Sequence, residues 1–116
     1  MPKKPVSKNI GRLNEDIKRE LIDIIGNMKD PRLKGGLLTV TRVDTTSDLA
    51  QSKVYVSVMD REGGAEEVVE ALRAAKGHVR SEISQRMHIR RAPEFIFIAD
   101  DSAAYADHIN KMLKDL

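Results

Sequence analysis

Apolar residues recur every three or four positions in the first quarter of the chain, and this spacing predicts an amphipathic helix over residues 8–28. Ser7 or Asn9 is expected to cap its start, and Pro31 is expected to end it, because proline cannot continue a helix. A helix of this kind buries its apolar face against another element. The residues of that face are Ile10, Leu13, Ile17, Leu21, Ile24, Ile25 and Met28.

Alternating apolar and polar positions next predict two strands, within residues 37–43 and 52–59, separated by a polar, turn-like linker. The two strands are expected to pair as an antiparallel hairpin. Strict alternation in the first strand places Val40 and Val43 on opposite faces. The segment "RRAPEFIFIADDS" predicts a third strand with apolar residues on both sides, which implies burial on both faces.

A second apolar stripe at helical spacing runs from Val68 to Met87 and passes through a glycine, Gly77. A glycine inside a helix costs about 1 kcal/mol relative to alanine, so Gly77 is expected to mark a kink in this helical region. The alternative is a helix that ends at Gly77 and is followed by a new helix from His78. A last helix is expected to begin near Ser102.

The predicted order is helix, strand, strand, helix, helix, strand, helix, which indicates an α+β fold with one small sheet. The 116 residues are expected to form one domain, with a flexible basic arm over residues 1–6 and a folded part over residues 7–116. The chain contains no cysteine, which excludes disulfides and suits a reducing cytoplasm. No apolar run approaches the roughly 20 residues that cross a bilayer, and the basic N-terminus is not expected to be a secretory signal.

Charges are distributed unevenly along the chain, although the formal net charge is only +2. Residues 73–91 carry six Lys/Arg against one Asp/Glu, and residues 1–34 carry nine against five. Residues 60–72 carry five acids against one base. Such asymmetry favours a polyanionic partner on one face, and an ordinary solvated surface is the alternative that charge alone leaves open.

Three cations surround Gly77, because Arg73, Lys76 and Arg80 are three and four residues apart and share one face of a helix. The N–H groups at a helix start donate readily to phosphate oxygens. A glycine has no Cβ that would keep a sugar-phosphate chain away from the main chain. This combination predicts a contact with a nucleic-acid backbone at Gly77.

Motifs for catalysis and metal binding are missing from the sequence, which contains no HExxH, no Gly-rich phosphate loop and no GxSxG. The histidines, His78, His88 and His108, are not at paired ligand spacing. We therefore expect no enzymatic activity, no metal and no cofactor.

Three stretches of the chain resemble one protein family, in the family's order. "KDPRLKGGLLTVTRVDTTSDLAQSKVYVSV", "LRAAKGHVRSEISQRM" and "IRRAPEFIFIADDS" are similar to the ribosome-binding factor A family. His78 departs from the family pattern, in which a larger apolar or aromatic residue follows the glycine. The matching features are the helix stop Asp30-Pro31-Arg32, the strand entry from Asp48-Leu49 to Val56, the Ala75-Lys76-Gly77 kink and the strand start Pro93-Glu94.

The resemblance implies a single type II KH-like domain, in the order α-β-β-α-(kink)-α-β-α, in which an Ala-x-Gly kink replaces the usual Gly-x-x-Gly loop. It further implies a non-enzymatic assembly factor that binds the free, immature small ribosomal subunit and its rRNA during late maturation and pre-rRNA processing, notably in the cold. Neighbouring ribosomal proteins are implied as partners, and a ribosome-associated GTPase is implied in release. We expect a cytoplasmic monomer that contacts no membrane.

The candidate RNA-binding residues form a centre around the predicted kink, with further residues on both sides of it in the sequence. The centre is Arg73, Ala75, Lys76, Gly77, His78 and Arg80. The extensions are Arg86, His88, Arg90 and Arg91, then Lys3, Lys4, Lys8 and Arg12 as a basic arm and first helix turn, and finally Arg32, Arg42 and Lys53. Two alternatives stay open: a protein-interaction module that docks a basic ribosomal protein through its acidic loop at residues 60–70, and a generic small RNA-binding domain.

Overall fold

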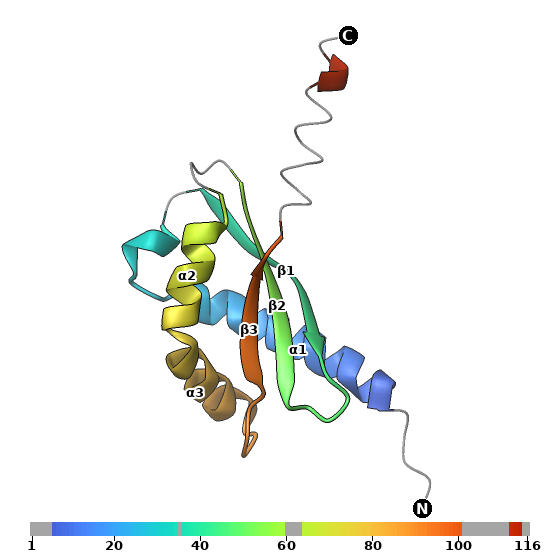
Figure 1. Cartoon of the computed structure of the whole chain (residues 1–116). Coiled ribbons are helices and arrows are strands. Elements are labelled where there is room, and N and C mark those ends of the chain that lie inside the picture. The colour runs from blue at the N-terminus through green and yellow to red at the C-terminus, as the bar shows by residue number, and fades with distance from the viewer. Residues whose placement is uncertain (1–5, 35, 60–63, 101–111, 115–116) are drawn as a thin grey trace, which may run out of the picture.

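The computed structural model describes residues 6–34, 36–59, 64–100 and 112–114, and the side chains of residues 10 onward within these ranges. Its elements are arranged as one sheet with helices on one side of it and along one edge (Figure 1). In chain order they are α1 (Val6–Gly26), the short 3-10 helix η1 (Pro31–Leu33), β1 (Leu37–Thr45), β2 (Gln51–Met59), α2 (Glu66–Ala74), α3 (Lys76–Met87) and β3 (Glu94–Ala99).

The sheet has the strand order β1-β2-β3 within the described residues, so β2 is central and β3 lies at an edge. β1 and β2 pair antiparallel, whereas β2 and β3 pair parallel. A parallel pair needs a long crossover, which α2 and α3 supply. The predicted hairpin, the third strand and the α+β class are thereby confirmed.

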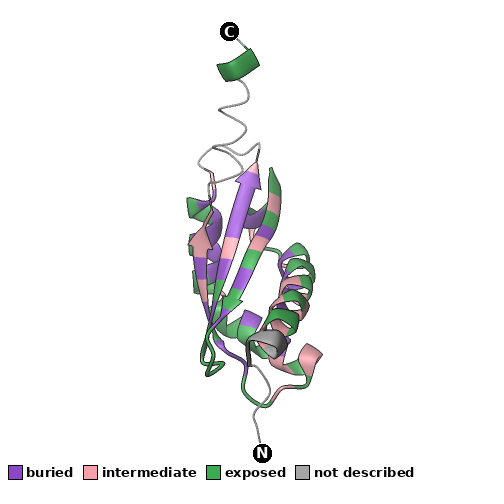
Figure 2. Cartoon of the chain, turned by 90° about the vertical axis from the view of Figure 1, so that its right-hand side faces the viewer, coloured by how far each residue is buried: buried purple, intermediate pink, exposed green. Residues whose placement is uncertain are grey.

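One hydrophobic core joins the sheet to the helices. α1 passes behind the sheet, and the stripe predicted from its spacing supplies the buried residues of that helix (Figure 1). Along the strands, buried and exposed positions alternate (Figure 2). The most deeply buried side chains of the core are Ile17, Leu21, Val54, Val56, Val68, Val69, Leu72, Val79, Ile83 and Phe97.

The first helix begins at Val6, two residues before its predicted start, and ends at Gly26. Ser7 and Asn9 therefore lie inside α1, and the prediction that one of them caps it is wrong. A proline precedes Val6 in the sequence, and proline suits a helix start because the N–H it lacks has no partner there.

The prediction that Pro31 ends the first helix is wrong, because α1 ends at Gly26, five residues before the proline. Pro31 begins η1, and a carboxylate oxygen of Asp30 accepts a hydrogen bond from the backbone N–H of Arg32 at 2.9 Å. This is a side-chain cap at the start of a short helix. Gly36 then adopts a left-handed backbone, with φ of 72°, and turns the chain into β1.

A β-bulge in β1 corrects the predicted faces of that strand. The pairing with β2 shifts between Val40 and Arg42, so Thr41 is an extra residue in the strand. The extra residue reverses the alternation, and Val40 and Val43 are both buried rather than on opposite faces. The Thr41 hydroxyl donates to the Asp100 carboxylate at 2.6 Å.

The helical region around Gly77 consists of two helices, and the break between them lies at Ala75, two residues before the expected position. Ala75 leaves the helical region, with φ of −98° and ψ of 12°, and its N–H closes the last turn of α2. Gly77 is the second residue of α3, so it is neither the kink itself nor the end of a helix. The break arises because α2 and α3 each bury their own apolar residues in the same core.

Two further expectations meet the structure only in part. Phe95 and Phe97 are buried, whereas Ile96 and Ile98 on the other face of β3 are half-buried, so the burial expected on both faces is incomplete. Of the basic arm predicted over residues 1–6, residues 1–5 lie outside the described residues, and residue 6 is wrongly assigned to it because Val6 begins α1. The start of the predicted last helix also lies outside the described residues, whereas residues 112–114 of it are described and helical.

Candidate nucleic-acid interface

A row of cations follows the outer edge of β3. The guanidinium of Arg73, at the end of α2, donates to the backbone oxygen of Phe97 at 3.2 Å. The guanidinium of Arg80, one turn into α3, donates to the backbone oxygen of Ala92 at 3.0 Å. These bonds fix both arginines against the strand, and a guanidinium has five N–H donors, so others remain for a ligand.

Two hollows meet on this side of the molecule. The larger, of about 320 Å³, is lined by Gly77, Arg80, Ser81, Ser84, Arg90, Arg91 and Ala92. The smaller, of about 210 Å³, is lined by Lys76, Gly77, Arg80, Glu94 and Phe95. Gly77 and Arg80 belong to both hollows, which are therefore adjoining. We use the name basic face for Arg73, Lys76, Gly77, Arg80, Arg90 and Arg91.

Gly77 leaves the main chain of α3 open at the centre of the basic face. A Cβ built at this position would meet no atom within 4 Å. Its φ is not in the left-handed region, so neither packing nor backbone conformation within the protein requires a glycine. The absent side chain leaves the main chain of α3 exposed at this position.

The start of α3 is free of the groups that usually satisfy a helix N-terminus. No side chain caps it, and its first turn contains no acidic residue. The N–H groups of a first helical turn have no carbonyl partner within the helix and attract anions. A phosphate at this position would meet backbone donors and the Lys76 ammonium together.

The other cations of the basic face are exposed and available. The side chains of Lys76, Arg90 and Arg91 are exposed and make no hydrogen bond or ion pair with the described residues, and the same holds for the neighbouring His78. The geometry therefore brings together most of the predicted centre, along with Arg90 and Arg91 from the loop that precedes β3. Ala75, also predicted, lies at the break between α2 and α3 and is half-buried.

Arg86 is not part of this face. Its guanidinium reaches across to α1 and lies 2.5 Å from the Asp23 carboxylate and 3.3 Å from that of Glu20, with Glu82 of its own helix also at 3.3 Å. The hydrogen bond that Arg86 donates to Asp23, together with those that it donates to Glu20 and Glu82, raises the pKa of Arg86. The side chain ties α3 to α1, and charge counting along the sequence could not show this.

Arg32 is likewise occupied elsewhere. Its guanidinium forms two hydrogen bonds to the Asp30 carboxylate, at 3.2 and 2.9 Å. The side-chain bond from Arg32 is the main reason that the pKa of Asp30 is lowered. The acidic residues Glu70 and Glu67 of α2 lie near enough to favour the charged arginine further, so Arg32 lies in an acidic environment.

The remaining candidates are dispersed over the molecule. Arg42 stacks over the Tyr55 ring at 4.6 Å, beside the exposed Lys53, on the sheet face that no described helix covers. His88 ends α3 with a left-handed backbone, and Arg12 is exposed on α1. Lys3 and Lys4 lie outside the described residues, as does the side chain of Lys8.

The structure adds residues that were not predicted. Ser81 and Ser84 contribute hydroxyl groups to the larger hollow, and Glu94 contributes a carboxylate to the smaller one. Positions 77, 80, 81 and 84 have the three- and four-residue spacing of one helix face, so the serines could have been found by extending the spacing from Gly77.

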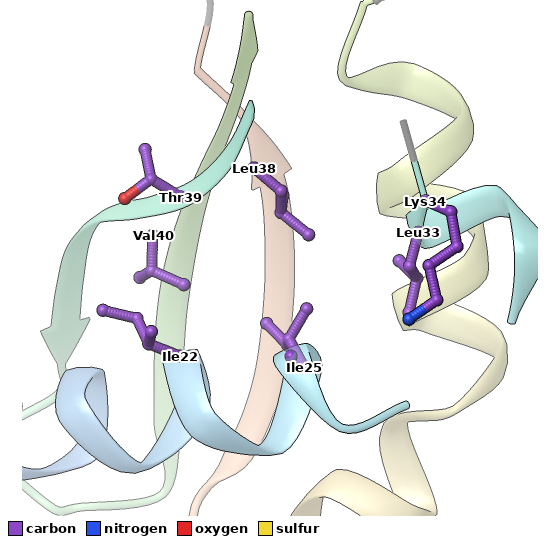
Figure 3. A pocket seen from close by; sticks show the side chains of 8 residues that line it. Ile22, Ile25, Leu33, Lys34, Leu38, Thr39 and Val40 are labelled. Atoms are coloured by element: carbon purple, nitrogen blue, oxygen red, sulfur yellow. The ribbon is translucent and has the colours of Figure 1, made fainter. Parts of the chain in front are cut away.

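An apolar hollow of about 240 Å³ lies apart from these cations, between α1, η1 and β1. Figure 3 shows Ile22 and Ile25 of α1 facing Leu38 and Val40 of β1, with Leu33 across from them. Its lining is mainly aliphatic, with Lys34 and Thr39 as the polar side chains, and offers few groups to orient a substrate. Among the described residues no cluster of three acidic or histidine side chains could hold a metal, and no helix could cross a bilayer.

Comparison with known proteins identifies close relatives of this chain. A sequence model of the family described as ribosome-binding factor A matches residues 9–113. The chain is 43% identical over 106 residues to ribosome-binding factor A of Staphylococcus carnosus, and the match covers 90% of each chain.

Solved structures resemble the fold as well as the sequence. The solution structure of a Thermotoga maritima ribosome-binding factor A homologue superposes with a TM-score of 0.73 at 31% identity, over 87% of this chain and 94% of that one. A homology model of Thermus thermophilus ribosome-binding factor A, fitted into a cryo-EM map of its complex with the 30S subunit, superposes with a TM-score of 0.63 at 30% identity. That match covers 76% of this chain and 91% of the other, and the expected KH-like fold is confirmed.

Proposed function

Because the chain belongs to the ribosome-binding factor A family, we propose that it binds the free small ribosomal subunit and its rRNA during late maturation and pre-rRNA processing. The relative fitted into a 30S complex supports this assignment. In the present structure the proposal rests on the row of cations beside the open main chain at Gly77.

The basic face would contact the RNA backbone. Lys76, Arg90 and Arg91 supply exposed charges, while the start of α3 supplies backbone donors near Gly77. Contacts to phosphate hold a protein in register on RNA without reading bases. Specificity then comes from the shape of the folded rRNA and from the ribosomal proteins next to it.

The wider cellular role follows from the family in the same way. We propose that the protein acts as a cytoplasmic monomer, that a ribosome-associated GTPase assists its release, and that the requirement for it is greatest in the cold. No catalytic step is assigned to the chain, since a family named for ribosome binding needs none for this role.

Lys76→Glu tests the proposed face. Reversing one charge at a phosphate contact should weaken binding to purified free small subunits and reduce the slope of log affinity against log salt by about one or more. Lys29→Glu is the matched control, because Lys29 is an exposed lysine between α1 and η1, outside the basic face. It makes the same change in net charge and should alter the slope much less.

Equal effects of the two variants would show that only net charge matters, which would contradict the assignment of this face. Nuclease treatment of the complex between the protein and the small subunit separates the proposed function from its protein-binding alternative. A complex held by rRNA should dissociate, whereas a complex held by the acidic residues between positions 60 and 70 and a basic ribosomal protein should survive.

A further inference from the structure

The tip of the β1–β2 hairpin is a tightly hydrogen-bonded turn. The N–H of Thr46 donates to Gln51 O and the N–H of Leu49 donates to Thr46 O, both at 2.9 Å. The Asp48 carboxylate accepts from the N–H of Ala50 at 3.0 Å and from the Thr46 hydroxyl at 2.6 Å. These bonds set the backbone at position 49 without any help from the side chain there.

That backbone is unfavourable for the residue it carries. Leu49 has φ of 61°, in the left-handed region that glycine and asparagine adopt easily and leucine rarely does. Its side chain is 46% exposed and is not part of the hydrophobic core. A single exposed leucine needs no explanation, but one held in a strained backbone that it does not stabilise points to a contact outside the protein.

The surroundings of Leu49 are acidic. A hollow of about 420 Å³ beside it is lined by six residues that include the carboxylates of Asp48 and Glu94 and no cation. The Thr46 hydroxyl bond is the main reason that the pKa of Asp48 is lowered, so this carboxylate is charged at neutral pH. Carboxylates repel phosphate, and an aliphatic side chain has neither a ring for stacking on a base nor a donor for its edge.

The hairpin tip adjoins the basic face. The N–H of Glu94 donates to Ala50 O at 2.9 Å, and Glu94 also lines the hollow that contains Lys76 and Gly77. A partner bound at the hairpin tip therefore lies next to a ligand bound at the basic face.

We propose that Leu49 inserts into an apolar pocket on a basic protein that lies beside the rRNA contacted by the basic face. This inference rests on the proposed function, because it places that protein on the small subunit. Asp48 and Glu94 flank the leucine and complement a basic rim around the pocket.

Leu49→Gly separates the two roles of this residue. Glycine relieves the backbone strain, so resistance to denaturant should be retained or increased, whereas affinity for the free small subunit should fall about ten-fold or more through the lost apolar burial. The salt slope should not change, which distinguishes this loss from that of a phosphate contact. Ile22→Ala is the control, because Ile22 is 48% exposed in α1 and should affect binding little.

Unchanged affinity of Leu49→Gly for subunits that the unaltered protein binds would overturn the hairpin contact and leave the proposed function standing. If the unaltered protein does not bind the subunit, the proposed function itself fails. An equal loss in Ile22→Ala would likewise contradict a specific contact at the hairpin.

Cross-linking identifies the partner class. The chain has no cysteine, so Leu49→Cys carries one thiol that a benzophenone maleimide labels uniquely. On the free small subunit this probe should cross-link to protein, in a product that protease removes and nuclease does not. A probe at Ser81→Cys, in the larger hollow, should cross-link to rRNA. Cross-links from position 49 to rRNA alone would overturn the proposal.

Discussion

Gly77 is the residue at which the structure and the proposed function are most closely linked. It is exposed in α3, a Cβ there would contact nothing, and its backbone is helical. The usual structural reasons for glycine, a left-handed backbone or crowding within the fold, are both absent. In the proposed function, the absent side chain lets an RNA backbone approach the main chain of α3 at this position.

Gly77→Ala is expected to separate folding from binding. Alanine favours a helix over glycine by up to about 1 kcal/mol, so the free energy of unfolding should stay the same or rise. Affinity for the small subunit should fall, because the new methyl group would stand between the RNA backbone and α3. Denaturant unfolding and subunit binding, measured on the same preparation, test both parts.

Gly26→Ala is the matched control for this experiment. Gly26 is also an exposed helical glycine whose added Cβ would meet no atom within 4 Å. It should leave subunit affinity unchanged. Loss of stability in Gly77→Ala, with affinity retained by the folded molecules, would show that the glycine serves the fold instead.

At the level of elements, the spacing of apolar residues predicts whether a segment is a helix or a strand. It predicts less well where that helix or strand is interrupted. The period of α1 and the alternation in β2 are visible in the sequence because each element has one buried face. The break at Ala75 was not predictable from propensity, since alanine favours helices more than Gly77 does. The bulge at Thr41 was equally hidden, because it depends on the pairing of β1 with β2.

The hydrogen-bond partners of individual arginines could not be predicted from the sequence either. Arg80 and Arg86 are six residues apart in one basic segment, yet Arg80 bonds to the loop before β3 and Arg86 to α1. A count of charges treats them alike. The packing of α3 between the loop before β3 and α1 decides their roles. It places Arg80 on the basic face, whereas Arg86 holds α3 against α1.

Arg86→Gln should therefore weaken the fold rather than the interface. Removing the guanidinium leaves three carboxylates close together, from Glu20, Asp23 and Glu82, so the midpoint of thermal unfolding should fall. The fall should be smaller in an Asp23→Asn background, because the two side chains interact directly. Subunit affinity per folded molecule should not change, and a clear loss of affinity would return Arg86 to the interface.

For the whole molecule, the arrangement of charge matters more than its total. A formal net charge of +2 conceals a basic face on α3 and the loop before β3, an acidic start of α2, and an acidic hairpin tip. Their positions could be inferred along the chain but not in space. The crossover through α2 and α3 decides which of them become neighbours.

The pH dependence of stability should reflect two aspartates that begin tight turns. Hydrogen bonds lower the pKa of Asp30 and of Asp48 below the ordinary value of 3.8. Both carboxylates therefore bind protons more weakly in the folded chain than in the unfolded chain. Their contribution to stability is present above about pH 4 and is lost as the pH falls through the lowered pKa values.

Asp48→Asn should reduce the loss of stability that occurs as the pH falls. Asparagine keeps an oxygen that can accept from Thr46 and Ala50 but does not titrate. Urea midpoints measured between pH 7 and pH 2 should decline less steeply for the variant than for the unaltered chain. Parallel curves would mean that the hairpin turn is not coupled to protonation of Asp48.

The arginines on the outer edge of β3 have a second consequence. Arg73 and Arg80 occupy backbone oxygens at Phe97 and Ala92, on and just before a strand that has no neighbouring strand on that side within the described sheet. The backbone groups along a strand edge are a template on which another chain can add a strand unless they are occupied. Because the two arginines that we propose face the RNA also occupy this edge, substitutions that neutralise them are expected to favour self-association.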